Sequence, residues 1–212
     1  MRTLRSIDEV AAVVTDAAGE VAGRRRIVGI VGRPGAGKST IAVQLVDRLG
    51  ASAALVPMDG FHLPQATLVE LGRRDRMGAP DTFDVDALVR LLERLTDVAA
   101  APTSIRAPGF DREIEEPVPD AIEVPAAASI IVLEGNYLLL DSDGWERVRG
   151  FLDLSLFVEV DQDLRIDRLV ARHIRFGKSP DSARAWALGP DETNAMLIAA
   201  TESRADYAIA LG

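Results

Sequence analysis

The feature of this sequence that most constrains its fold is a glycine-rich motif, Gly32-Arg33-Pro34-Gly35-Ala36-Gly37-Lys38-Ser39. It follows an apolar, β-rich run at residues 26–31 and precedes a helical pattern at residues 40–49. The spacing G-x-x-x-x-G-K-[ST] is typical of a phosphate loop, in which backbone N–H groups surround phosphate oxygens at the N-terminus of a helix. The order of strand, loop and helix therefore predicts a nucleotide-binding α/β unit.

Residues of this motif have separate chemical tasks. Lys38 is expected to reach the β- and γ-phosphates, and Ser39 to offer its hydroxyl to Mg²⁺. Thr40 follows in the first helical turn, and we count it with the nucleotide-binding residues. The motif therefore predicts that the chain binds a nucleoside triphosphate together with Mg²⁺.

Composition limits the size of the fold and the class of partner. The chain has 212 residues, of which 48% are hydrophobic and 27% charged, and this predicts one globular domain over residues 1–212. A formal charge of -9 argues against non-specific binding to nucleic acid or to anionic membranes. Because no apolar run approaches the ~20 residues that span a bilayer, and the first residues lack an export signal, we expect a cytoplasmic location.

The absence of cysteine excludes disulfides, thiolate zinc sites and a cysteine nucleophile. The expected partner is a small molecule with a hydroxyl group. The sequence leaves the oligomeric state open, with a homodimer as one alternative.

Strand and helix patterns alternate along the chain. Apolar, β-rich runs at 53–56, 129–133, 154–160 and 207–211 alternate with helical patterns at 84–95, 164–176, 181–188 and 191–203. Such continuous apolar strands are typical of a parallel sheet that is covered on both faces. We therefore predict an α/β fold with a doubly wound parallel sheet and a helical lid at residues 164–180.

Two segments of the chain are predicted to lie outside this sheet. Ser6 and Glu9 have the spacing of a capping box, so residues 1–22 are expected to carry an N-terminal helix, reaching about Val21, that is appended to the nucleotide fold. The charged stretch at 110–125 holds three prolines, and we interpret it as an irregular loop.

Asp59 is the first candidate for catalysis. It follows the β-rich run at 53–56, so its carboxylate can face the γ-phosphate and accept the proton of an acceptor hydroxyl. The alternative, a simple Asp-Gly turn with Gly60, is less favoured beside a phosphate loop. His62 can either touch the substrate or hydrogen-bond the loop, and both readings stay open.

Glu134 is the candidate for the Mg²⁺ site. It ends the β-rich run at 129–133, where a carboxylate can act on Mg²⁺ or its waters in the manner of a Walker B acid. Its alternative role is a charge that faces solvent. Tyr137 can line the same mouth and touch substrate, or it can pack in the core.

Four arginines, Arg165, Arg168, Arg172 and Arg175, are spaced three, four and three residues apart. At ~100° per residue they fall on one stripe of a helix. A solvated basic face is one interpretation. We favour a lid in which Arg172 and Arg175 stabilise the transferring phosphate and Arg168 contacts the nucleotide.

Together these motifs resemble the P-loop kinases that comprise uridine kinase, phosphoribulokinase and type I pantothenate kinase. This family resemblance implies that the predicted α/β fold is of the nucleoside-kinase-like P-loop NTPase type. Asp59-Gly60-Phe61 is similar to the segment that carries the catalytic base of that family, and Glu134-Gly135 matches its Glu-Gly pair. Residues 76–84 resemble a pantothenate kinase stretch, and Asn194 falls near the position of an Asn that contacts substrate there. The pattern is closest to a branch labelled as fructose-transport-system kinases.

Two departures from the family pattern concern the acceptor. Gly78 stands where uridine kinases hold ribose with an Asp, and residues 105–109 lack the Tyr and His of pantothenate kinases. The resemblance therefore implies an ATP- and Mg²⁺-dependent kinase acting on a hydroxyl of a sugar or a pantothenate-like alcohol. A uridine or other nucleoside kinase and a non-kinase nucleotide-binding regulator are the alternatives. A GTPase is disfavoured because the sequence has no Asn-Lys-x-Asp segment.

Overall fold

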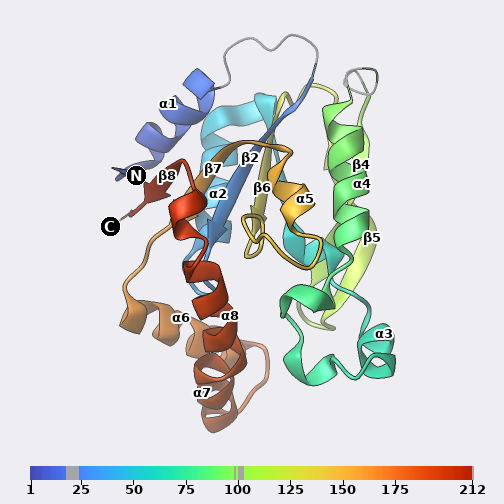
Figure 1. Ribbon diagram of the computed structural model, residues 1–212, viewed down its shortest axis with the longest axis vertical. Helices are drawn as coiled ribbons and strands as arrows, with labels where there is room; N and C mark the ends of the chain where they lie inside the picture. The colour runs from blue at the N-terminus through green and yellow to red at the C-terminus, as the bar shows by residue number, and fades with distance from the viewer. Residues whose placement is uncertain (18–23, 98, 100–102, 212) are drawn as a thin grey trace.

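The computed structural model describes residues 1–17, 24–97, 99 and 103–211, and it is built on a six-stranded parallel sheet (Figure 1). The strands in spatial order are β1 (Arg2–Leu4), β8 (Tyr207–Ile209), β7 (Leu152–Val158), β2 (Arg26–Gly32), β6 (Ile130–Gly135) and β3 (Ala53–Pro57). All neighbouring pairs are parallel. The predicted doubly wound α/β fold is confirmed.

Apolar helices cover both faces of the sheet, as the continuous apolar runs predict. On one face, α1 (Ile7–Ala17) and α2 (Lys38–Leu49) bury side chains against Val28 and Ile30 of β2. On the other face, α4 (Val85–Thr96) and α5 (Glu146–Arg149) pack with a cluster that includes Ile27 and Val31 of the same strand. The central strand is thus buried on both sides, which requires apolar residues at successive positions.

The remaining helices lie at the end of the sheet where the strands point (Figure 1). They are α3 (Gln65–Glu70), α6 (Gln162–Arg175), α7 (Pro180–Leu188) and α8 (Pro190–Ala199). Asp84 caps α4 by accepting a hydrogen bond from the Ala87 amide at 2.8 Å, as its position in the sequence predicts. No helix in the described ranges has both the length and the apolar character to cross a membrane.

The N-terminal residues correct one prediction. Strand β1, which the sequence did not indicate, pairs with β8 at the edge of the main sheet. The first residues are therefore part of the fold rather than an appendage to it. The helix predicted to reach Val21 is described as α1, which ends at Ala17, and residues 18–22 of that prediction lie outside the described residues.

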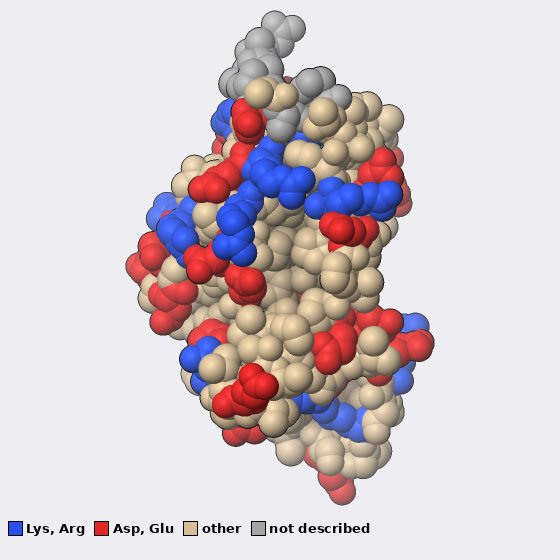
Figure 2. All heavy atoms as spheres, turned by 90° about the vertical axis from the view of Figure 1, so that its right-hand side faces the viewer, with Lys and Arg blue, Asp and Glu red and all other residues tan. Residues whose placement is uncertain are grey.

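The charged stretch at 110–125 is the second correction. It contains β5 (Glu116–Val124), which pairs antiparallel with β4 (Ile105–Asp111) in a two-stranded ribbon. The prolines misled the prediction because they are usually signs of an irregular loop. Within the described residues, β5 has no partner on its other side, and such an edge strand tolerates proline although proline has no backbone N–H to donate. Acidic and basic side chains lie next to one another on the side of the molecule that carries this hairpin and α4 (Figure 2).

The hairpin packs directly against the turn that carries Asp59. This turn, η2 (Met58–Phe61), follows β3, and a Cβ atom on Gly60 would lie 2.3 Å from the backbone oxygen of Pro108 in β4. Gly60 is therefore required for contact between two backbones. The hairpin and the Asp59 turn are fixed relative to each other.

We expect Gly60→Ala to lower the free energy of unfolding by about 1–3 kcal/mol, because the new methyl group must displace the β4 backbone. Gly150→Ala is the matched control, since Gly150 has helical dihedral angles and its nearest atom to a new Cβ lies at 3.5 Å. Denaturant unfolding of both variants measures the difference. Equal stability of the two would contradict the close packing.

Candidate active site

The phosphate loop joins the end of β2 to the first residue of α2, as its motif predicts. Two of its glycines have left-handed dihedral angles, with φ of 81° at Gly35 and 94° at Gly37. A Cβ on Gly35 would also lie 2.7 Å from the backbone oxygen of Arg165. The loop therefore needs glycine there both for its conformation and for its contact with α6.

Lys38, Ser39 and Glu134 meet at the carboxyl edge of the sheet. The Ser39 hydroxyl donates to Glu134 Oε2 at 3.2 Å, and Lys38 Nζ lies 3.9 Å from Glu134 Oε1 and donates to the Arg33 backbone oxygen at 3.2 Å. Burial lowers the pKa of Lys38 and raises that of Glu134, and the opposite charge of each partner counteracts both shifts. The pair is thus a buried polar centre beneath the phosphate loop.

These residues fit a Mg²⁺ ion that is held mainly by phosphate oxygens and water. The described residues include no group of three or more His, Cys, Asp or Glu side chains that could hold a metal alone. Mg²⁺ in nucleotide sites needs only one or two protein oxygens, and the Ser39 hydroxyl and Glu134 carboxylate are hard donors of that kind. The two side chains already contact each other, so one ion can reach both.

Asp59 lies in the same pocket, just beyond the end of β3. Its Oδ2 accepts a 2.6 Å ion-pair contact from Arg112 Nη2. Burial by itself raises the pKa of Asp59, but the charge of His62 in its protonated form and the charges of Arg112, Lys38 and Arg172 lower it below its ordinary value. Asp59 is therefore a carboxylate at neutral pH, as a proton acceptor must be.

His62 lies beside Asp59, between two aromatic rings. Its Nδ1 is 2.8 Å from the Asp59 backbone oxygen, and its ring centroid is 4.0 Å from that of Phe83 and 4.7 Å from that of Phe110. Burial lowers its pKa, so the ring is neutral at pH 7. A carbonyl partner requires a proton on Nδ1, which leaves Nε2 as an acceptor at the pocket that His62 lines. Both roles that the sequence left open are therefore compatible.

The four arginines of the lid helix do not form the single functional stripe that the sequence predicts. Arg165 is fully buried, donates to the Pro34 backbone oxygen at 3.2 Å and pairs with Glu192 of α8. Arg172 lines the pocket, whereas Arg168 lies 3.4 Å from the Cβ position of Gly37. At ~100° per residue, seven residues turn a helix by about 20° less than two full turns, so Arg165 and Arg172 form one row, and Arg168 and Arg175 form a neighbouring row about 60° away.

These arginines therefore differ in what they can contact. The Arg172 guanidinium forms no hydrogen bond or ion pair with a described residue, and burial lowers its pKa. Arg168 lines a second hollow with Gly37, Thr40 and Gln44, on the other side of the phosphate loop. Arg175 lies at the surface, with its guanidinium 5.8 Å from the Phe176 ring centre, and lines neither hollow.

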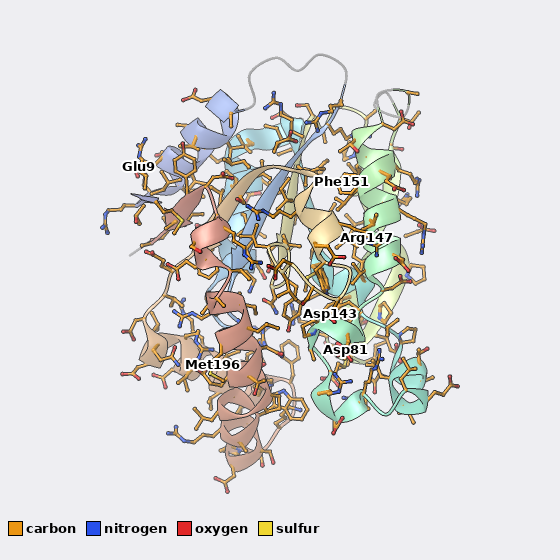
Figure 3. The ribbon with its side chains drawn as sticks, in the orientation of Figure 1. Glu9, Asp81, Asp143, Arg147, Phe151 and Met196 are labelled. Atoms are coloured by element: carbon orange, nitrogen blue, oxygen red, sulfur yellow. The ribbon has the colours of Figure 1, made fainter. Side chains whose placement is uncertain are left out.

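Tyr137 and Asn194 converge on one backbone oxygen. The Tyr137 hydroxyl donates to the Gly78 oxygen at 2.5 Å, and Asn194 Nδ2 donates to the same atom at 3.3 Å. Tyr137 is 1% exposed and packs in the core, while Asn194 lines the pocket. Asn194 also lines a second groove with Asp81 and Asp143, two residues that Figure 3 shows close to one another.

The structure adds residues that the sequence analysis missed. Lys178 lies 4.5 Å from the ring centre of Trp186, and His173 Nε2 is 2.7 Å from Asp191 Oδ2. All four line the pocket on the lid side, and Arg112 lines it on the hairpin side. Only Lys178 carried a signal, because it lies in the loop that ends the predicted lid. Arg112 was not singled out from the sequence, because the segment that contains it was incorrectly predicted to be an irregular loop.

Comparisons with known proteins agree with this site. The chain matches the Phosphoribulokinase / Uridine kinase family over residues 27–209. An ATP-dependent kinase-like protein of Aspergillus versicolor is 41% identical over 134 residues, which cover 60% of this chain and 77% of that protein. A protein of Schizosaccharomyces pombe named as a candidate uridine kinase is 36% identical over 169 residues, which cover 73% of this chain and 68% of that protein.

A solved structure extends the similarity over nearly the whole chain. A protein of Silicibacter sp. TM1040, named as a candidate fructose transport system kinase, superposes with a TM-score of 0.86 at 34% sequence identity. The match covers 97% of this chain and 99% of that chain. The predicted resemblance to P-loop kinases is therefore confirmed.

We expect Arg165→Ala to lower the free energy of unfolding by about 3–5 kcal/mol, because the Pro34 oxygen loses its side-chain donor and the Glu192 carboxylate loses its charge partner. Arg184→Ala on α7 is the matched control, since Arg184 is exposed, and we expect a change within about 0.5 kcal/mol. Denaturant unfolding measures both. A small effect at Arg165 would show that the guanidinium is not an anchor of the loop.

Proposed function

The chain belongs to the phosphoribulokinase/uridine kinase family, and we propose that it transfers the γ-phosphoryl group of ATP, with Mg²⁺, to a hydroxyl of a small metabolite. Membership in this family supports ATP-dependent phosphotransfer. The identity of the acceptor and the roles of single residues are our proposals.

One observation carries the proposal. A single pocket contains the phosphate-loop residues Lys38 and Ser39, the carboxylates Asp59 and Glu134, and the lid residue Arg172. Phosphoryl transfer requires charge stabilisation of the phosphate and a group that orients the nucleophile, and these side chains supply both. The second hollow beside Arg168 is proposed to take the nucleoside, so that the phosphates run along the loop toward Lys38.

The residues divide the chemistry between them. Lys38 and the loop amides bind the β- and γ-phosphates, and Arg172 offsets the charge on the transferring group. Asp59 orients the acceptor hydroxyl and takes its proton as the new P–O bond forms and the bond to the β-phosphate oxygen breaks. Mg²⁺, when held by Ser39 and Glu134, would neutralise phosphate charge.

The acceptor is proposed to be a sugar or a pantothenate-like alcohol. A uridine kinase remains the alternative, because a relative carries that name, but Gly78 provides no side chain to hold a ribose. Its oxygen is also already occupied by Tyr137 and Asn194. An ADP-release assay with ATP, Mg²⁺ and a panel of sugars, sugar acids, nucleosides and pantothenate tests the proposal. Release that no acceptor stimulates would contradict it.

For Asp59→Asn we expect ATP binding to persist and kcat to fall by roughly 10² to 10⁴, the range of a lost general base. Because the pKa of Asp59 lies below its ordinary value of 3.8, the base stays ionised as the pH falls. Protonation of Asp59 should therefore not lower the kcat of the parent enzyme between pH 8 and about pH 5, whereas protonation of Glu134, whose pKa is raised by burial, can lower it at the acidic end. A parental rate in the Asn variant would remove Asp59 from the chemistry.

Arg172→Ala is expected to lower kcat by roughly 10³-fold, since an arginine that clamps the transferring phosphate has effects of that size. Arg172→Lys should restore little of the rate, because lysine lacks the planar fork. Arg175→Ala tests the second row of arginines on the lid helix. A parental kcat in this variant would remove Arg175 from the residues predicted to be catalytic. Initial rates of ADP release, with melting temperatures as the folding control, decide between these outcomes.

A further inference from the structure

We propose that Arg112 binds an anionic group, a carboxylate or a phosphate, on the acceptor, so that the enzyme selects acidic acceptors over their neutral counterparts. This inference rests on the proposed kinase function and names the class of acceptor. Arg112 lies at the tip of the β4–β5 hairpin and lines the same pocket as Asp59.

The guanidinium has donors to spare. An arginine side chain carries five N–H donors, and the contact of Arg112 Nη2 with Asp59 Oδ2 at 2.6 Å is its one hydrogen bond among the described residues. The Arg112 side chain is 42% exposed. A planar guanidinium with an open edge beside the catalytic carboxylate suits bidentate binding of a second carboxylate or phosphate.

The hairpin tip that carries Arg112 is anchored. Asp111 Oδ1 accepts a hydrogen bond from the Glu113 amide at 2.8 Å, and Gln65 Nε2 donates to the Ile114 backbone oxygen at 2.8 Å. Arg74 pairs with Glu115 at 2.7 Å. The guanidinium is therefore presented by a fixed turn, which lowers the entropic cost of binding an anion.

The charge balance of the pocket favours an added anion. Asp59 faces Arg112, Glu134 faces Lys38, and the two remaining carboxylates that line the pocket face Arg74 and His173. Arg172 and Lys178 line the same pocket and form no close ion pair with a carboxylate of a described residue, although the charge of Asp191 acts on Arg172 from a longer distance. The phosphates of ATP can pair with Arg172. An anionic acceptor would then pair with the positive charge that remains in the pocket.

The proposed reaction itself provides the strongest argument. When Asp59 takes the proton of the acceptor hydroxyl, its carboxylate becomes neutral and Arg112 loses its charge partner. An anion of the acceptor bound to Arg112 keeps the guanidinium paired at that moment. The contact therefore becomes stronger as the proton moves, which is the kind of interaction that raises the rate.

The first test compares acceptors that differ only in charge. Pairs such as D-glycerate and glycerol, pantothenate and pantothenyl alcohol, and fructose 6-phosphate and fructose are assayed for ADP release by the parent enzyme. We expect kcat/KM to be higher by on the order of 10²-fold for the anionic member of a pair that is phosphorylated. The phosphate pair against the carboxylate pairs shows which anion is preferred.

The second test changes the residue. We expect Arg112→Ala to abolish this preference by lowering kcat/KM for the anionic acceptor on the order of 10²-fold, with KM for ATP nearly unchanged. Arg112→Lys should recover part of the preference, since it keeps the charge. Arg106→Ala is the matched control, because Arg106 lies on the same hairpin and pairs with Glu123 at 3.4 Å outside the pocket.

The outcomes separate the two proposals. Turnover of neutral and anionic members at equal kcat/KM, or an Arg112→Ala variant that keeps the preference, overturns the inference and leaves the kinase function standing. A rise of KM for ATP instead would assign Arg112 to the γ-phosphate and overturn it as well. ADP release stimulated by no acceptor of either kind contradicts the proposed function itself.

Discussion

The parallel register of three neighbouring strands is the constraint on which the site depends. Pro57 of β3 is paired with Glu134 of β6, and Val31 of β2 with Gly135. Because the strands run in the same direction and stop at the same level, the loops that follow them open at one edge of the sheet. The phosphate loop, Glu134 and Asp59 thus meet although about 100 residues of chain separate the first from the second. The apolar residues that bury both faces of β2 hold this register.

Burial of these charges has an electrostatic cost that the surrounding residues offset. Desolvation opposes the charged forms of Lys38, Glu134 and Asp59 alike. Each of these side chains has an opposite charge nearby, and all three line the same pocket. A phosphate or a metal ion that takes the place of one charge partner therefore does not leave the other side chain without an opposite charge. Arg165 differs, because it is fully buried and its partners belong to the phosphate loop and to α8. It positions the loop, whereas Arg172 remains free among the described residues to bind.

The sequence predicts the phosphate side of this site far better than the acceptor side. A phosphate loop must have a fixed spacing between a strand and a helix, so Gly32 to Ser39 indicated both its fold and its ligand, and Glu134 followed from its position at a strand end. The side of the pocket that we propose to bind the acceptor is formed by contacts between segments that are distant in the sequence. Prolines and exposed acidic residues made β5 look irregular, and this error concealed Arg112. Likewise, the spacing of the lid arginines predicted a shared face, but only packing against the loop distinguishes buried Arg165 from exposed Arg175.

The difference between the phosphate side and the acceptor side of the site has a physical origin, and this origin bears on acceptor specificity. The phosphate site is built at the end of the buried sheet, where a change in one strand would disturb the register of its neighbours. The hairpin, by contrast, is a separate two-stranded ribbon that contacts the Asp59 turn through the backbone of Pro108 and Gly60. This contact between backbones does not involve the side chain at position 112, so the hairpin does not depend on that side chain for its place. If Arg112 binds the acceptor as we propose, a change at position 112 would alter which acceptor is bound without disturbing the sheet register that positions the phosphate loop, and acceptor specificity would then lie at the hairpin tip.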